Sequence, residues 1–154
     1  PSLSPIPELA VDTLEQLVRC LVGRGERPGL VGSSLGGFYA TYLAEKYALK
    51  AVLINPSIKP YETLASYVGL NHSFFDFSDY EWTQKHIDSL KRYHMDEVDA
   101  DRFLLLLQTG DDVLDYRKAA TRFDGAEMVI EEGGSHGFEN FETKIPLIRS
   151  FLGV

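Results

Sequence analysis

Hydrophobic residues recur along the chain with two kinds of spacing, which predict helices alternating with strands. Predicted helices have apolar positions three or four residues apart; they span 11–22, 38–47, 61–68, 81–94, 116–123 and about 141–152. Predicted strands are short apolar runs typical of a sheet buried on both faces; they span 29–32, 50–55, 103–107 and 127–130. Pro146 either kinks the last helix or marks its true start.

The alternating order predicts how these elements assemble. Strands separated by helices pair in parallel through right-handed crossovers, so we expect an α/β fold with a doubly wound, mostly parallel sheet. The pattern breaks between about residues 57 and 100, where we expect a short helical, lid-like insertion. We predict a single domain over 1–154, with ligands bound beyond the carboxyl ends of the strands.

Composition narrows the possible partners. The 154 residues hold 23 Asp and Glu against 15 Lys and Arg, and the net charge of -8 disfavours nucleic acid and anionic membrane surfaces as partners. Cys20 is the only cysteine, so no internal disulfide or cysteine-based metal site is expected. No apolar run approaches the roughly 20 residues that span a bilayer, and we expect a cytoplasmic protein. The sequence does not indicate an oligomeric state.

Candidate chemistry begins at Gly32-Ser33-Ser34-Leu35-Gly36, which matches the Gly-x-Ser-x-Gly nucleophile elbow between a predicted strand and a predicted helix. Ser34 is the expected nucleophile. Its sharp turn requires small neighbours, and we expect side chains at Gly32 and Gly36 to collide with adjoining elements. The Leu35 N–H, at the start of the helix, is the expected donor to an oxyanion.

An alternative interpretation makes this segment a glycine-rich turn that cradles a phosphate group. Against it, the chain lacks the Gly-x-x-x-x-Gly-Lys pattern and has no ribose-binding acid in good register downstream. We therefore favour the nucleophile elbow.

A carboxylate that orients a catalytic base is expected at residues 108–116, directly after the strongest predicted strand. Asp111 and Asp112 compete for this role, and either is alternatively a turn residue or a helix cap. For Asp115 helix capping is the better explanation.

His136 is the expected general base, because its glycine-rich loop follows the last predicted strand. The chain order Ser, Asp, His, with each residue at the end of a separate strand, is the order found in α/β-hydrolases. Such a triad cleaves an acyl compound through an acyl-enzyme and needs no metal or organic cofactor. His72, His86 and His94 have no comparable setting and are expected to be ordinary surface or insertion residues, although His72 is also a secondary candidate for lining the pocket.

Together, five segments resemble the YqiA-like esterases, which are small bacterial α/β-hydrolases. The segments are the elbow Gly-Ser-Ser-Leu-Gly-Gly-Phe-Tyr-Ala-Thr at 32–41, Ile-Asn-Pro at 54–56, Lys-Pro-Tyr-Glu at 59–62, Gln-Thr-Gly-Asp-Asp-Val-Leu-Asp-Tyr at 108–116 and Glu-Glu-Gly-Gly-Ser-His at 131–136. The resemblance implies hydrolysis of carboxylic esters or acyl thioesters by Ser34, Asp111 and His136. It favours Asp111 over Asp112, since the family's acid directly follows Thr-Gly.

The sequence departs from that family at its start. Such proteins are expected to begin with a strand and a His-Gly-Phe-type loop that donates a second oxyanion N–H, and the sequence from Pro1 shows neither, since Pro1 matches a point past that loop. We therefore expect an N-terminally truncated chain that hydrolyses esters weakly or not at all by itself, because one lost oxyanion donor costs about 2.7–4 kcal/mol of transition-state stabilisation.

Two other functions stay open. The same triad could cleave amides or peptides, or the chain could be a non-catalytic module that binds an acyl ligand or a protein through residues 61–82. Aromatic residues of the insertion either wall an acyl pocket or pack the insertion onto the core; they are Phe74, Phe75, Phe77, Tyr80 and Trp82. Acyl length and leaving group are not indicated.

Overall fold

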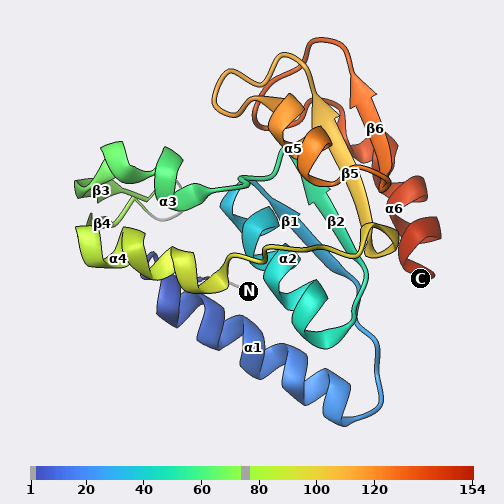
Figure 1. The fold of residues 1–154 in the computed structure, drawn as a ribbon, viewed down its shortest axis with the longest axis horizontal. Coiled ribbons are helices and arrows are strands. Elements are labelled where there is room, and N and C mark those ends of the chain that lie inside the picture. Colours follow the sequence, from blue (N-terminus) through green and yellow to red (C-terminus); the bar gives the residue numbers. More distant parts are fainter. Residues whose placement is uncertain (1–2, 74–76) are drawn as a thin grey trace. The chain divides into compact units, whose positions relative to one another are not determined.

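The computed structural model, which describes residues 3–73 and 77–154, contains a four-stranded parallel sheet (Figure 1). Its order is β1-β2-β5-β6. These strands are β1 (Leu30–Ser33), β2 (Ala51–Ile54), β5 (Phe103–Gln108) and β6 (Glu127–Glu131). All four predicted strands are present, with ends shifted by one residue at most positions. Because the strands are parallel, the loops that follow them share one edge of the sheet.

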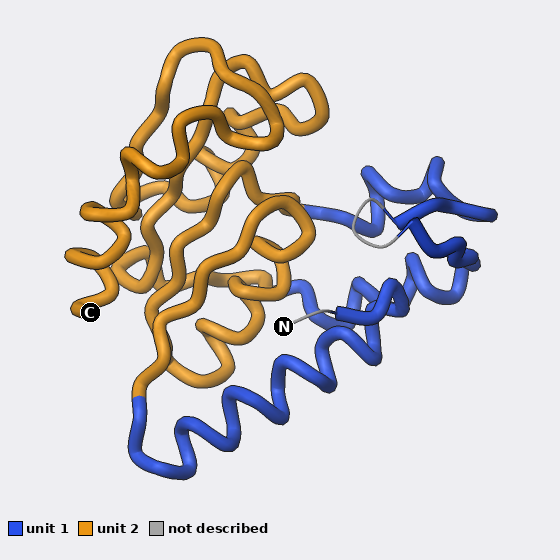
Figure 2. Tube along the Cα trace, turned by 180° about the vertical axis from the view of Figure 1, so that it is seen from behind, with its two compact units in different colours: residues 1–26, 59–94 blue, residues 27–58, 95–154 orange. Residues whose placement is uncertain are grey.

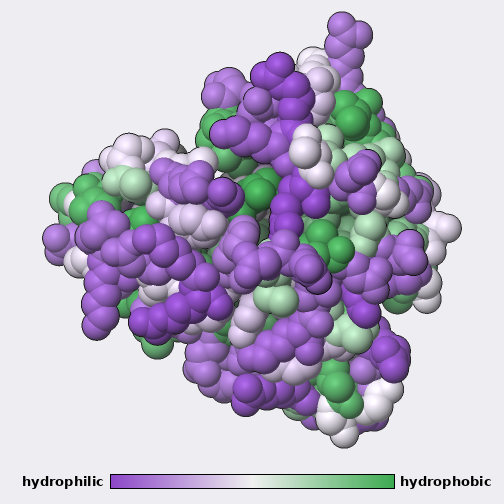
Figure 3. All heavy atoms as spheres, in the orientation of Figure 1, coloured by the Kyte–Doolittle hydropathy of each residue, from purple (hydrophilic) through white to green (hydrophobic). Residues whose placement is uncertain are grey.

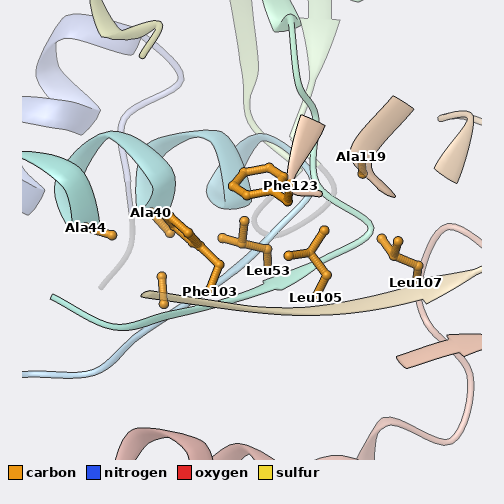
Figure 4. Close-up of a cluster of buried hydrophobic side chains, with 9 residues drawn as sticks. Ala40, Ala44, Leu53, Phe103, Leu105, Leu107, Ala119 and Phe123 are labelled. Carbon is orange, nitrogen blue, oxygen red and sulfur yellow. The ribbon is translucent and has the colours of Figure 1, made fainter. Parts of the chain in front are cut away.

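Helices cover both faces of this sheet, which confirms the doubly wound arrangement. Helices α2 (Leu35–Tyr47) and α5 (Tyr116–Arg122) pack on one face, over buried residues of β2 and β5 that include Leu53 and Leu105 (Figure 4). Helix α6 (Ile145–Leu152) packs on the other face, where Ile148 joins residues such as Leu104. Every residue of β5 is buried, as expected for an apolar run in a covered parallel strand.

Two helix boundaries depend on proline. Helix α1 (Pro7–Gly23) begins four residues before its predicted start, with Pro7 in the first turn, where its missing N–H breaks no hydrogen bond. Pro146 likewise lies in the first turn of α6. Of the two predicted alternatives, Pro146 therefore marks the start of the last helix, and a separate 3-10 turn, η4 (Phe141–Lys144), precedes it.

The segment between β2 and β5 contains a hairpin that the sequence pattern did not predict. Strands β3 (Gly69–His72) and β4 (Asp79–Trp82) pair antiparallel, so the helix predicted over 81–94 begins only at Gln84. The other elements here are short; they are α3 (Pro60–Thr63), η1 (Ala65–Tyr67), α4 (Gln84–Ser89), η2 (Leu90–Tyr93) and η3 (Ala100–Arg102).

Of the aromatic residues expected to wall a pocket or pack the insertion, Phe74 and Phe75 lie outside the described residues. Trp82 is buried and donates its indole N–H to the Pro5 carbonyl at 2.7 Å, and its ring contacts Tyr80 edge-on. Phe77, by contrast, is 85% exposed. Trp82 thus packs within the fold, while Phe77 does not.

Contacts divide the chain into two compact units (Figure 2). Unit 1 comprises residues 1–26 and 59–94, and unit 2 comprises residues 27–58 and 95–154. Unit 2 holds the whole parallel sheet together with α2, α5 and α6. Whether the chain behaves as the single domain expected from its length stays a prediction.

Hydrophilic residues predominate on the face drawn in Figure 3, as the net charge of -8 leads one to expect. Over residues 3–73 and 77–154, no helix has both the length and the apolar character needed to cross a membrane. The cytoplasmic location stays a prediction.

Candidate active site

The turn from β1 into α2 holds Ser34 in a conformation that few residues adopt. Its φ and ψ are 53° and -120°. The Ser34 N–H donates to the Ile54 carbonyl at 3.0 Å, while the Ser34 carbonyl accepts from the N–H groups of Gly37 and Ser57, each at 3.0 Å. Backbone strain of this kind persists only where the surroundings fix it, and it is typical of functional sites. The geometry agrees with the predicted nucleophile elbow.

Glycine is required at one of the two motif positions that we expected to be crowded. A Cβ on Gly32 would lie 2.2 Å from the Gly36 carbonyl oxygen, so the expectation for Gly32 is confirmed. The expectation for Gly36 is wrong, because nothing lies within 4 Å of a Cβ there. The crowded position is instead Gly37, where a Cβ would lie 2.7 Å from the Pro56 side chain. Gly37 thus lies against Pro56, two residues beyond the end of β2.

Asp111 lies in the loop after β5 with its side chain only 2% exposed. One carboxylate oxygen, Oδ1, accepts the N–H groups of Val113 at 2.9 Å and Leu114 at 2.8 Å. The other, Oδ2, is 2.8 Å from His136 Nδ1. Asp112 is exposed, so of the two competing aspartates it is Asp111 that contacts the histidine.

His136 lies between Asp111 and Ser34. Its Nε2 is 3.0 Å from Ser34 Oγ, and its side chain is 25% exposed. The structure therefore brings together the three side chains that the sequence singled out, with the imidazole between the hydroxyl and the carboxylate. Leu35 is the first residue of α2, so no carbonyl within that helix can accept its N–H.

Asp115 caps α5, as expected: its side chain accepts the Arg117 N–H at 3.0 Å. The hydrogen bond and charge of the Arg117 guanidinium lower the pKa of the Asp115 carboxyl. Asp115 therefore serves as a helix cap, and its hydrogen bonds go to Arg117 and not to His136.

The other three histidines belong to unit 1 and have local partners. His72 pairs with Asp79 directly across the hairpin. His86 completes the capping box of α4 with Thr83, and the His94 ring packs edge-on against Tyr61. These contacts agree with the expectation that they are ordinary insertion residues.

Sequence reasoning missed two buried amides beside the triad. Asn55, which directly follows β2, is 2% exposed, and Gln108, the last residue of β5, is 3% exposed. Both hydrogen-bond the loop that carries His136. The available signal was a polar residue at the carboxyl end of each buried strand, where ligands and functional groups gather in parallel sheets.

Gln108 is also connected to an ion pair between Glu131 and Lys144. Lys144 of η4 contacts Glu131, the last residue of β6, and Gln108 donates a second hydrogen bond to the same carboxylate. Together these two contacts, the Lys144 ammonium first, lower the pKa of Glu131. Both contacts therefore favour the ionised form of Glu131.

Comparison with known proteins places the chain among relatives of unassigned activity. Residues 1–153 match the sequence profile of the uncharacterised protein family UPF0227. The chain is 27% identical over 127 residues to the UPF0227 protein YcfP of Salmonella gallinarum and 26% identical to that of Salmonella paratyphi B. Each alignment covers 82% of this chain, and the chain spans 65% of the length of each relative. The resemblance to the YqiA-like group is confirmed at the level of the family.

Solved structures that resemble the chain are α/β-hydrolases. The esterase domain of a Rhodothermus marinus protein superimposes with a TM-score of 0.63 at 17% identity, covering 93% of this chain and 67% of that one. The monoacylglycerol lipase of Paleococcus ferrophilus gives a TM-score of 0.62 at 16% identity, covering 95% and 75%. An α/β superfamily hydrolase from Oenococcus oeni gives 0.62 at 15%, covering 99% and 77%. At these identities the likeness shows the fold, which is that of the α/β-hydrolases.

Proposed function

This chain belongs to the uncharacterised family UPF0227, and we propose that it is a serine hydrolase that cleaves carboxylic esters or acyl thioesters. The observation that carries the proposal is the position of His136, with Nε2 3.0 Å from Ser34 Oγ and Nδ1 2.8 Å from Asp111. Within an α/β-hydrolase fold, this contact pattern has a direct chemical use. The names of two structural neighbours, an esterase and a monoacylglycerol lipase, agree with esters as the substrate class.

In the proposed reaction, His136 starts as a neutral imidazole that donates Nδ1–H to Asp111 and accepts the Ser34 hydroxyl proton at Nε2. Ser34 Oγ attacks the acyl carbonyl as that proton leaves, and the Leu35 N–H donates to the oxyanion that forms. The imidazolium then protonates the leaving alcohol or thiol as the acyl–oxygen or acyl–sulfur bond breaks. In the second half, His136 accepts a proton from water as the water oxygen attacks the acyl carbon. The imidazolium then returns a proton to Ser34 Oγ as the Ser34–acyl bond breaks and the carboxylic acid leaves. No cofactor enters these steps.

The fixed orientation of the Asp111 carboxylate also supports the general-base role of His136. Asp111 Oδ1 is already held by two backbone N–H groups, so Oδ2 keeps one orientation toward the imidazole. A carboxylate fixed in this manner selects the tautomer with a proton on Nδ1 and stabilises the imidazolium. Proton transfer from Ser34 then needs no rearrangement of the loop.

Replacing the nucleophile tests the proposal. Ser34→Ala in the intact protein should lower kcat for p-nitrophenyl acyl esters by about 10⁴–10⁶-fold, because the residual rate comes from binding and the oxyanion donor alone. Ser33→Ala is the matched control, since Ser33 is the adjacent serine and is an exposed residue at the end of β1. It should retain turnover and labelling by a fluorophosphonate probe.

Several outcomes would contradict the assignment. Undiminished ester hydrolysis by Ser34→Ala would exclude Ser34 as the nucleophile. An intact protein that a fluorophosphonate does not label would favour the non-catalytic acyl- or protein-binding module. Faster cleavage of amides than of esters of the same acyl group would move the substrate class to amides.

A further inference from the structure

Two buried carboxamides lie between the sheet and the loop that carries His136. Asn55 and Gln108 are 2% and 3% exposed, and neither takes part in the acyl-transfer steps. A buried polar group left without a partner costs about 1–3 kcal/mol. The partners of these two side chains therefore indicate what the fold uses them for.

The Asn55 side chain forms hydrogen bonds with backbone carbonyls of the loop that carries His136. Its Nδ2 donates to the Ser135 carbonyl at 3.0 Å and to the His136 carbonyl at 3.1 Å. Its Oδ1 accepts the Gln108 N–H at 3.0 Å, which links the two amides. The Asn55 backbone has a φ of 39°, in the left-handed region that asparagine tolerates better than most residues.

Gln108 holds the same loop on both sides of His136. Its Oε1 accepts the N–H of Ser135 at 3.1 Å and of Glu139 at 2.8 Å. Its Nε2 donates to the Glu139 carbonyl and to Glu131 Oε2, each at 3.0 Å. A carboxamide offers two donor hydrogens and two acceptor sites, and Gln108 uses all four.

The loop is shaped to lie against Gln108. A Cβ on Gly134 would lie 2.1 Å from Gln108 Oε1, and the φ of Gly134 is 75°. Nearby, the Gly110 N–H donates to the Gly133 carbonyl at 2.7 Å, so the loop carrying Asp111 is bonded to the loop carrying His136. Any change at Gln108 therefore acts on the backbone that places the imidazole.

We propose that Asn55 and Gln108 are positioning residues that fix the His136 loop so that the imidazole bridges Ser34 and Asp111. The catalytic part of this inference rests on the proposed function, while the placement of His136 is a structural property that needs no substrate. A misplacement of about 1 Å in a catalytic group costs about 10²-fold in rate. Two amides that bracket His136 are suited to prevent such a displacement.

Asn55→Asp tests the first amide. The substitution keeps the size of the side chain and the oxygen that accepts the Gln108 N–H, but it turns a second oxygen toward the Ser135 and His136 carbonyls. In the intact protein, kcat for an ester should fall by about 10–100-fold with KM changed by less than about twofold, because binding groups are untouched. The low-field proton resonance of His136 Nδ1–H should shift or broaden.

Asn71→Asp is the matched control. Asn71 Nδ2 also donates to two backbone carbonyls, those of Tyr67 at 2.8 Å and Gly69 at 2.9 Å, but in the β3–β4 hairpin. The same chemical change there should leave kcat and the His136 resonance unaltered. A decrease in both variants would indicate a general effect of the added charge and overturn the positioning role.

Gln108→Met provides a second variant of similar volume that cannot hydrogen-bond the loop. Circular dichroism and thermal unfolding first establish that each variant is folded. Folded Asn55→Asp and Gln108→Met with wild-type kcat and an unchanged His136 resonance would overturn the proposal, as would failure of both to fold. A displaced resonance in a protein that proves to have no hydrolase activity would retain the positioning role and reject the proposed function.

Discussion

At the scale of single residues, the two carboxylate oxygens of Asp111 have different partners. Oδ1 is fixed by the N–H groups of Val113 and Leu114, and Oδ2 contacts His136. The loop thus orients the carboxylate before the carboxylate orients the imidazole. This division separates Asp111 from Asp112, which has the same chemistry but is exposed.

Asp111→Asn should lower kcat by about 10⁴-fold, because an amide facing Nδ1 favours the tautomer with its proton on Nε2, which cannot accept the Ser34 proton. Asp112→Asn is the matched control and should change kcat by less than about twofold. Steady-state ester hydrolysis by the intact protein measures both. The reverse result would move the orienting role to Asp112.

The sequence singled out the three side chains that the structure brings together, because each lies in a recognisable local pattern: an elbow motif, an acid after a strand and a histidine in a glycine-rich loop. It could not separate Asp111 from Asp112 by residue pattern alone, since adjacent positions differ only in the direction that the folded loop gives them. Asn55 and Gln108 were missed for a related reason. Their partners lie on loops distant in sequence, and no local motif marks those contacts.

At the scale of elements, the elbow depends on the close approach of β1 and α2. A Cβ on Gly32 would lie 2.2 Å from the Gly36 carbonyl oxygen and 2.8 Å from the Gly37 nitrogen. These are backbone atoms, so relief requires a movement of the helix or strand. The space beside Gly36 itself is open.

Gly32→Ala should therefore lower the free energy of unfolding by about 1–3 kcal/mol, the usual cost of overpacking. Gly36→Ala should leave it unchanged or raise it by up to about 1 kcal/mol, because alanine has the higher helix propensity and meets no neighbour. Urea denaturation of both variants gives the comparison. Equal stabilities would show that β1 and α2 can separate at no cost.

Elements buried on both faces were the easiest to predict. The strands of the parallel sheet stand out as apolar runs because covering helices require apolar residues at every position. The β3–β4 hairpin was missed because each of its strands is only four residues long, too short for an alternating pattern to stand out. Trp82 belongs to β4, and its spacing from later apolar residues only imitated a helical period.

At the scale of the whole molecule, global stability should respond to pH through the Glu131–Lys144 pair. The pair joins the end of β6 to η4 within unit 2, and Lys144 is the main reason that the pKa of Glu131 is lowered. A carboxyl with a depressed folded pKa contributes stability that is present above its unfolded pKa and lost as pH falls through the folded pKa.

Lys144→Met should accordingly unfold at lower urea concentration than the wild type at about pH 7, with the difference shrinking toward about pH 3. Lys85→Met is the control, because Lys85 is exposed and no ion pair to it is found within residues 3–73 and 77–154. It should show no pH-dependent difference from the wild type. A constant deficit for Lys144→Met across this range would assign the loss to packing and not to charge.

The alternating order of elements predicted the doubly wound sheet, because few chain paths connect parallel strands through helices. It did not predict the division into two compact units, in which residues 1–26 group with 59–94. That grouping depends on contacts between distant segments, which composition and periodicity do not encode.

The alignment of β1 with β2 carries a further consequence. Ser33 pairs with Ile54, and the next residue along the chain is Ser34. A slip of one position would move the hydroxyl by about 3.3 Å along the strand and turn each β1 side chain to the opposite face. Helix and strand content would barely change, so a variant could keep a native-like spectrum while its serine no longer reaches the histidine. At the carboxyl end of β1, a native-like spectrum therefore does not show that Ser34 is in place to contact His136.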